Sequence, residues 1–212
     1  MRRPLRIDQD MSDILIIGVA ILLREKNGFL FELQKPAKWR RQRGGVLEIG
    51  MSCIGGTVEE GETLECALHR EAFEEIGCRI AFDRSTHPFS MDPNGRVSPL
   101  PPRSVPDGVQ FVWAGNDPGF VAGAKVAVYV GHTIGRAEPG DLPAIVELGP
   151  DLFYVLGTRP LTIQSVEQRG GILQERRRIP RSAHLTPVGT ASQLLELRRQ
   201  HPELLQGILR EA

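Results

Sequence analysis

Apolar residues in this chain gather in short runs separated by turn-forming and charged residues, a pattern typical of a folded domain built on a β-sheet. The first run covers residues 14–23 and is followed by Lys26-Asn27-Gly28, where Asn-Gly is a strong hairpin signal because both residues tolerate positive φ. The run at 29–34 is then the returning strand. The chain is therefore predicted to open with an antiparallel hairpin.

Later apolar runs predict further strands at 46–54, 109–113, 125–133 and 144–156. Residues 63–76 favour a helix instead, because Leu, Ala and Glu dominate and there is no Pro or interior Gly. Thr63 is the expected N-cap of this helix, and Gly77 stands where it should end. Residues 84–108 are rich in proline and are expected to form a long loop or an ordered insertion.

The character of the chain changes after Gly157. Thr186-Pro187 resembles an N-cap followed by Pro at the first helical position, so a helix is predicted from there to Arg199, with a second short helix near Pro202. We divide the chain into a polar leader, a main domain and a C-terminal helical extension packed on the core. The three parts are residues 1–12, 13–157 and 158–212.

Charge and cysteine content narrow the class of protein. Lys and Arg number 26 against 26 Asp and Glu, and this zero net charge makes nucleic acid an unlikely main partner. Three cysteines without a C-x-x-C spacing argue against a disulfide framework or structural zinc, and indicate thiols in a reducing compartment. The apolar run at 14–23 is too short to span a bilayer and lacks signal-peptide features, so we expect a cytoplasmic protein that is not bound to membranes.

Three glutamates gather on one side of the predicted helix. At about 100° per residue, Glu71, Glu74 and Glu75 fall within an arc of about 100°. Like charges at this spacing repel one another, so a cation is expected among them, and oxygen ligands alone suit Mg²⁺ or Mn²⁺ better than zinc. The neighbouring arc is apolar and must face the core; it consists of Leu64, Leu68, Ala72 and Ile76.

The loop before the helix adds two expectations. Glycines at positions 55, 56 and 61 allow the backbone to bend tightly, and such a loop can bring a carbonyl oxygen close to a metal ion. Arg70 should point away from Glu71, about 100° round the helix, and orient a loop carboxylate, either Glu59 or Glu62.

This segment resembles the Nudix box, G-x5-E-x7-R-E-U-x-E-E-x-G-U, where U is apolar. Every fixed position is matched, by Gly56, Glu62, Arg70, Glu71, Glu74, Glu75 and Gly77. The U positions hold Ala72 and Cys78, and Cys78 is smaller than the usual aliphatic residue. The order of hairpin, strand, Gly-Gly loop and helix is also similar to this family, over roughly residues 13–157.

The resemblance implies an α/β fold, a Nudix-type α/β/α sandwich with a central mixed sheet. It also implies hydrolysis, dependent on Mg²⁺ or Mn²⁺, of a nucleoside diphosphate linked to another moiety. By position, the implied metal ligands are Glu71, Glu74, Glu75 and the carbonyl of Gly55.

The resemblance also implies catalytic and supporting roles. Glu74, Glu75 and Arg70 are the catalytic candidates, and Gly56, Glu59 and Glu62 support them. One of the box glutamates, or one on a later loop such as Glu147 or Glu167, would activate the attacking water. Metal ions clamp diphosphate oxygens and lower the pKa of a bound water, so no protein nucleophile is needed.

A basic segment precedes the box. Residues 35–43 hold five basic residues and no acidic one, and form either a solvated loop or a surface that meets substrate phosphates. Trp39 within it either stacks on a base or covers the core. A second basic patch, at residues 176–178 with Arg181, is expected on the surface. The substrate-binding candidates are Lys38, Trp39, Arg40 and Arg41.

The sequence leaves the substrate open. A nucleoside diphosphate sugar such as ADP-ribose is favoured, giving a nucleoside monophosphate and a phosphorylated product. An oxidised nucleoside triphosphate, a dinucleoside polyphosphate and a capped RNA end are alternatives. A different class of protein, a Nudix-fold sensor that binds a nucleotide without turnover, is disfavoured because all three box glutamates are present. A homodimer is left open.

Overall fold

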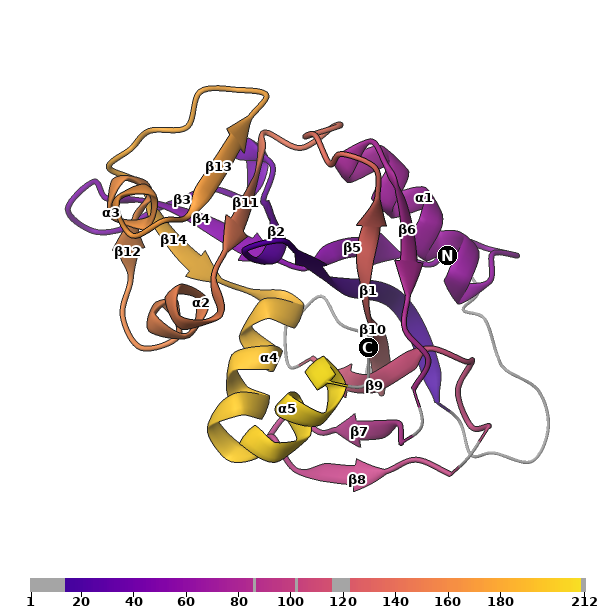
Figure 1. Cartoon of the computed structure of the whole chain (residues 1–212). Helices are drawn as coiled ribbons and strands as arrows, with labels where there is room; N and C mark the ends of the chain where they lie inside the picture. The colour runs from indigo at the N-terminus through magenta and orange to yellow at the C-terminus, as the bar shows by residue number, and fades with distance from the viewer. Residues whose placement is uncertain (1–13, 86, 102, 116–122, 211–212) are drawn as a thin grey trace.

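The computed structural model describes residues 14–85, 87–101, 103–115 and 123–210, so the predicted leader at 1–12 lies outside the described residues. Runs of consecutive strands are interrupted by the helices α1, α2 and α3, and two consecutive helices, α4 and α5, follow the last strand (Figure 1). The strands are β1 Leu15–Glu25, β2 Gly28–Leu33, β3 Arg40–Arg41, β4 Leu47–Ser52, β5 Ile54–Thr57, β6 Arg79–Phe82, β7 Phe89–Met91, β8 Val97–Pro99, β9 Val109–Ala114, β10 Ala124–Ile134, β11 Ala144–Leu148, β12 Leu161–Thr162, β13 Ile172–Glu175 and β14 His184–Pro187. The helices are α1 Leu64–Ile76, α2 Pro150–Leu156, α3 Ile163–Gln168, α4 Gly189–Gln200 and α5 Pro202–Arg210, with a 3-10 turn η1 at Pro36–Lys38.

The sheet is mixed. Its main path runs β12-β14-β4-β2-β1-β10-β9-β7-β8. The pairs β1·β10, β14·β4 and β7·β9 are parallel, whereas the hairpin β1·β2 and the pair β1·β5 are antiparallel. Strand β11 pairs with β2 and β13, and β6 pairs with β10. Strand β1 therefore lies at the centre, with β2, β5 and β10 beside it.

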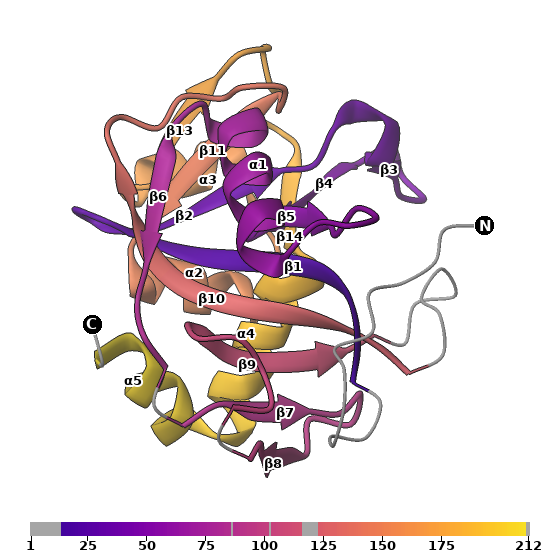
Figure 2. The same cartoon turned by 90° about the vertical axis from the view of Figure 1, so that its right-hand side faces the viewer.

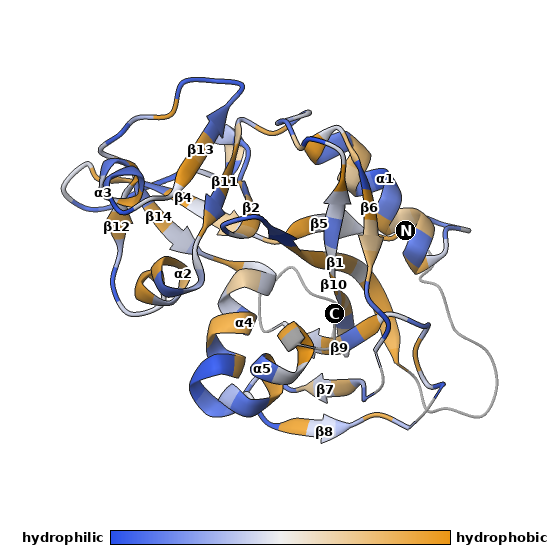
Figure 3. Cartoon of the chain, in the orientation of Figure 1, coloured by the Kyte–Doolittle hydropathy of each residue, from blue (hydrophilic) through white to orange (hydrophobic). Residues whose placement is uncertain are grey.

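Two apolar cores lie on opposite faces of this sheet. Alternate residues of β1 point to opposite faces, so Ile21 packs with Leu68 of α1 while Leu22 packs in the core that includes Leu194 of α4. Helix α1 covers one face, and α2 and α4 cover the other (Figure 2). Coloured by hydropathy, α4 shows both hydrophobic and hydrophilic stretches, as expected for a helix packed on a core (Figure 3). The predicted α/β/α sandwich is confirmed.

The opening hairpin forms as predicted, although for a different reason. Glu25 pairs with Gly28, so the two-residue turn is Lys26-Asn27, and neither Asn27 nor Gly28 has a positive φ. Gly28 is required because a Cβ there would overlap the backbone of Leu148 in β11. The glycine therefore permits close approach of two strands and supplies no special turn conformation.

Helix α1 matches its sequence prediction at both ends. The Thr63 hydroxyl accepts a hydrogen bond from the Cys66 N–H at 3.1 Å, and Gly77 ends the helix at φ 65°. The predicted apolar arc, Leu64, Leu68, Ala72 and Ile76, is buried. This burial fixes which side of the helix faces the sheet.

Two strand predictions were wrong in extent. The run at 46–54 is interrupted at Cys53, because β4 pairs with β2 and β14 whereas β5 pairs with β1. The run at 144–156 ends as a strand at Leu148, and Pro150 begins helix α2 at a position where a missing N–H costs nothing. The proline-rich segment at 84–108 contains the strands β7 and β8, so its described part is an ordered insertion.

The C-terminal segment ends in two helices, α4 and α5, as predicted, but its first half adds strands to the sheet. The Thr186-Pro187 helix start was wrong: both residues belong to β14, which pairs in parallel with β4, and α4 begins at Gly189. Pairing with a distant strand overrides the local capping signal here. The division of the chain at residue 157 stays a prediction.

All three cysteines are free thiols, as expected, with Cys53 and Cys78 buried and Cys66 exposed. In the part of the chain that the structure describes, none of the helices combines the length and apolar character needed to cross a membrane.

Candidate active site

The centre of the site is the contact between α1 and β5. The Gly55 N–H donates a hydrogen bond to Glu75 Oε2 at 3.0 Å, and Glu75 is only 6% exposed. Gly55 has a φ of 149°, and a Cβ there would overlap the carbonyl oxygen of Val19 in β1. The glycine thus lets β5 run close enough to β1 for its backbone to reach the glutamate of the helix.

Glu32 on β2 joins Glu75 at this point, and the sequence prediction missed it. The two side chains lie within hydrogen-bonding reach of each other, which requires a shared proton. Burial is the main cause that raises the pKa of both carboxyl groups. The charge of Glu71 raises both further, and the charge of Glu32 also raises the pKa of Glu75, whereas the hydrogen bond from Glu75 lowers that of Glu32. The available signal was a single charged residue between the fully buried Phe31 and Leu33.

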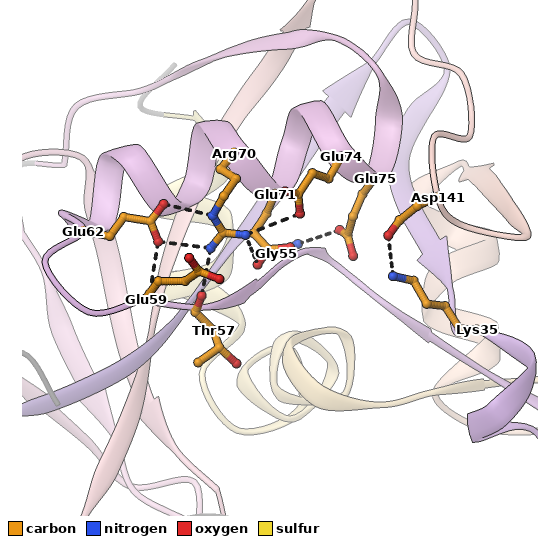
Figure 4. A network of polar contacts seen from close by, with 10 residues as sticks. All are labelled: Lys35, Gly55, Thr57, Glu59, Glu62, Arg70, Glu71, Glu74, Glu75 and Asp141. Carbon is orange, nitrogen blue, oxygen red and sulfur yellow. Dashed lines mark hydrogen bonds and ion pairs between the residues drawn. The ribbon is translucent and has the colours of Figure 1, made fainter. Parts of the chain in front are cut away.

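Arg70 organises the other end of the cluster (Figure 4). Its guanidinium donates to both carboxylate oxygens of Glu62 at 3.0 Å and to the Thr57 carbonyl at 3.0 Å. It also donates to Glu71 Oε1 at 2.8 Å and to Glu74 Oε2 at 3.4 Å. The hydrogen bond to Arg70 is the largest cause that lowers the pKa of Glu62. The predicted Arg70–Glu62 interaction is therefore present.

The expectation that Arg70 points away from Glu71 was wrong. The two side chains leave the helix in different directions, but the long arginine bends back far enough for Nη1 to reach the Glu71 carboxylate. Glu59 does not take the place of Glu62; its backbone N–H donates to Glu62 Oε2 at 3.1 Å and helps to hold that carboxylate.

Gly56 lies directly against the side chain of Glu71. A Cβ at position 56 would overlap the Glu71 carboxylate, so a larger residue there would displace this side chain from the position in which Arg70 holds it. Gly61 has a φ of 80°, a conformation that favours glycine, and nothing lies where its Cβ would be. Gly56 thus leaves space for a carboxylate, whereas Gly61 allows the loop its backbone conformation.

The donor set suits a hard divalent cation, although it is not closed around one. Among the residues that the structure describes, no three His, Cys, Asp or Glu side chains lie close enough together to hold a metal ion as they stand. The pairings explain this, because Arg70 holds Glu71 and Glu74 while Glu75 bonds to Glu32. The Glu32–Glu75 pair remains buried. Its carboxylate oxygens are the kind of donor that Mg²⁺ and Mn²⁺ prefer.

A cleft of about 660 Å³ opens beside this cluster. Glu32 and the loop glycines line it, and so do residues 186–190 and Ser192 of β14, α4 and the connection between them. Trp113 also lines the cleft and donates its indole N–H to the Thr190 hydroxyl at 3.2 Å. A segment far along the chain therefore supplies a wall of the cleft.

The predicted substrate-binding residues separate into two groups. Lys38 and Arg40 line the cleft. Trp39 packs against the core and donates its indole N–H to the Gln34 carbonyl at 2.6 Å, the geometry of a covering residue. Arg41 is exposed and bonds to the Gly45 carbonyl at 3.4 Å. A role in substrate binding stays a prediction for all four.

The late-loop glutamates are engaged elsewhere. Glu147 accepts a hydrogen bond from the Asn27 N–H at 2.8 Å, in the opening hairpin, and Glu167 pairs with Arg181 at 2.9 Å. In the second basic patch, Arg181 also binds Glu175 and Arg176 bonds to the Gly140 carbonyl.

Comparison with known proteins identifies the family. A family model for the NUDIX domain matches residues 15–114, which include the whole box. Residues 15–114 of the chain therefore match a Nudix domain, the family that the box motif resembles. A search of curated proteins found no match.

Solved structures with a similar fold come from several bacteria. A nudix family protein from Chromobacterium violaceum is 16% identical, with a TM-score of 0.36 over 66% of this chain and 65% of that one. The Escherichia coli ORF135 protein is 18% identical, with a TM-score of 0.39 over 68% and 80%. A NUDIX hydrolase from Nitrosomonas europaea is 12% identical, with a TM-score of 0.38 over 84% and 81%. The chain thus spans 65% of the length of the first of these.

Proposed function

We propose that this protein is a pyrophosphohydrolase, dependent on Mg²⁺ or Mn²⁺, that cleaves a nucleoside diphosphate linked to another moiety. The observation that carries the proposal is the buried Glu32–Glu75 pair, held by the Gly55 N–H next to a cleft with two basic residues, Lys38 and Arg40, on its wall. Such a site offers carboxylates to a cation and positive charge to a diphosphate.

In this proposal Glu71, Glu74 and Glu75 hold the divalent cation, with Glu32 and the Gly55 carbonyl as further oxygen donors. When bound, the cation supplies neutralisation of the diphosphate charge and makes water a better nucleophile at neutral pH. Arg70, anchored by Glu62 and the Thr57 carbonyl, fixes where Glu71 and Glu74 can move. Gly56, Glu59 and Glu62 support that arrangement.

We assign to Glu32 the role of accepting the proton from the attacking water. It lines the cleft, and it neighbours Glu75. Glu32 accepts a proton as the water oxygen bonds to phosphorus, and the bond between phosphorus and the bridging oxygen breaks, leaving the electron pair on the departing phosphate. Glu75, Glu74 and Arg70 position the reacting groups, and this kind of catalysis depends on positioning and electrostatics.

The favoured substrate is a nucleoside diphosphate sugar such as ADP-ribose, giving a nucleoside monophosphate and a sugar phosphate. The cleft of about 660 Å³ offers room for a group beside the diphosphate. Zero net charge gives little long-range attraction to a polyanion, which argues against an RNA end as the main substrate. A cytoplasmic location and a homodimer stay predictions.

A panel assay tests the proposal. ADP-ribose, an oxidised nucleoside triphosphate, a dinucleoside polyphosphate and a 5′-triphosphorylated RNA are incubated with the protein, with and without Mg²⁺, and monophosphate release is measured. We expect release from ADP-ribose that requires the cation and is lost in Glu75→Gln. Tight nucleotide binding without any turnover across the panel would instead indicate a sensor.

A further inference from the structure

The loop after β10 is fixed to the end of α1 that carries Glu74 and Glu75. The Gly140 N–H donates to the Glu75 carbonyl at 2.8 Å, and the Asp141 N–H donates to the Glu74 carbonyl at 2.9 Å. These are carbonyls of the last helical turn, which have no partner within a helix. A Cβ at Gly140 would overlap the Glu74 carbonyl oxygen, so the loop can approach this closely only with glycine there.

This attachment places the Asp141 side chain beside Lys35. Lys35 Nζ and Asp141 Oδ2 are 2.5 Å apart, and the two side chains are 50% and 48% exposed (Figure 4). Ion pairs this exposed contribute about 0–1 kcal/mol to folding, so stability alone gives little reason for the pair. Glu75 and Glu32 both raise the pKa of Lys35 through their charge, after the larger effect of Asp141, and Figure 4 shows Lys35 and Asp141 at the Glu75 end of the cluster.

Lys35 also has donors to spare, in contrast to Arg70. Arg70 uses each of its three nitrogens on a carboxylate or a carbonyl. An ammonium group has three N–H donors, and the contact with Asp141 uses one of them. A lysine on a four-carbon stem can turn its remaining donors towards a phosphate without leaving its partner.

We propose that Lys35, held at the C-terminal end of α1 by Asp141, binds an oxygen of the substrate diphosphate and offsets the negative charge that grows on the departing phosphate. Asp141 is the positioning residue in this pair. The inference rests on the proposed function and deepens it, because it assigns a cation to the reaction on the side of the cluster opposite Arg70. Lys35 keeps its proton throughout, and the bonds that form and break are those between water, phosphorus and the bridging oxygen.

The test compares kcat and KM for ADP-ribose with Mg²⁺ in the full chain and its variants. Loss of one preorganised donor to a developing anion lowers kcat by roughly 10²-fold or more, so we expect a drop of about that size in Lys35→Gln and about tenfold in Asp141→Asn. Lys35→Arg should recover part of the activity. The double variant should be no slower than Lys35→Gln, since Asp141 acts only through Lys35.

Two matched controls and a binding measurement separate this role from a structural one. Lys26→Gln, in the hairpin turn, and Asp151→Asn, in the first turn of α2, change exposed residues of the same types on other parts of the fold and should leave kcat within twofold. Calorimetry with α,β-methylene-ADP and Mg²⁺ should show weaker binding to Lys35→Gln but unchanged binding to Lys26→Gln.

Each result has a definite meaning. If the unaltered protein turns over no substrate, the proposed function fails. If it does turn over ADP-ribose while Lys35→Gln and Asp141→Asn stay within twofold of it, this inference alone is wrong. A higher Mg²⁺ requirement in Asp141→Asn with no effect of Lys35→Gln would also overturn it, because Asp141 would then serve the cation directly.

Discussion

The two ends of the carboxylate cluster differ in how their charge is balanced. At the end near the box loop, Arg70 contacts Glu62, Glu71 and Glu74 at 2.8 to 3.4 Å, so negative and positive groups are matched. At the other end, Glu75 and Glu32 are pushed together with the Gly55 N–H as the nearest donor to Glu75. The first end is built for orientation, whereas the second holds two buried carboxylates side by side, on which Lys35 and Lys38 act through their charge. That difference is why we place the divalent ion nearer Glu75.

The largest effect on catalysis should come from the end of the cluster that holds Glu75 and Glu32. Glu75→Gln keeps the shape and the Gly55 contact but removes the charge, and we expect kcat to fall by about 10²–10³-fold or more, comparable to losing a main electrostatic stabiliser. Steady-state kinetics at saturating Mg²⁺ measure this. Glu65→Gln, on the exposed side of the same helix, is the matched control and should change kcat by less than twofold. Equal activities in the two variants would remove the distinction between the two ends.

Substitution of Arg70 should lower kcat less than substitution of Glu75, and it should also lower the free energy of unfolding. Arg70→Gln breaks contacts with three carboxylates and the Thr57 carbonyl, so kcat should fall by roughly 10–100-fold while KM changes little. Hydrogen bonds to charged groups contribute about 1.5–3 kcal/mol each, and urea unfolding should show a loss of about that size. Arg70→Lys should not restore either quantity, because a lysine cannot make the two-pronged contact with Glu62. Full rescue by lysine would show that only charge matters there.

The wall of the cleft supplied by α4 should affect binding rather than chemistry. Ser192 lines the cleft, and Ser192→Trp should fill part of it. We expect KM for ADP-ribose to rise about tenfold, with kcat within threefold, because uniform binding is lost while the reacting atoms stay in place. Gln164→Trp, on an exposed position of α3, is the control and should leave KM unchanged. A fall in kcat without a change in KM would contradict this division of labour.

The smallest effect concerns stability and pH in the absence of metal. Burial and like charge raise the pKa values of Glu32 and Glu75 above 4.5, their ordinary value. A group with a raised pKa stabilises the fold fully below 4.5, and that contribution is lost as pH rises through the raised value. The free energy of unfolding should therefore fall as pH rises above 4.5. Glu32→Gln should flatten this slope, and so should Mg²⁺; urea unfolding across pH with chelator present measures it.

The same comparison explains how far the sequence could be interpreted. Helix α1 was predictable because its signals are local: Thr63 and Gly77 cap it, and its apolar residues follow the helical period. The Arg70–Glu62 contact was predictable in the same way, since both residues stand in one short motif. Glu71, Glu74 and Glu75 could be grouped from their spacing alone.

The parts that could not be predicted depend on contacts between distant segments. Glu32 reaches Glu75 only because β2 and β5 both lie beside β1, and no local pattern records that arrangement. Thr186-Pro187 has the chemistry of a helix start but is held as a strand by β4. Asp141 reaches Lys35 through a loop bound to the end of α1, across more than a hundred residues of chain. Register and loop attachment decided these positions.

The central claim is that Glu75 and its neighbours bind a divalent cation, and binding of Mn²⁺ followed by electron paramagnetic resonance tests it without relying on any substrate. The unaltered protein should take up Mn²⁺, and Mg²⁺ should compete for it. Glu75→Gln should bind at least tenfold more weakly, while Glu65→Gln should bind as the unaltered protein does. Equal Mn²⁺ binding in all three proteins, or none in any of them, would contradict the account.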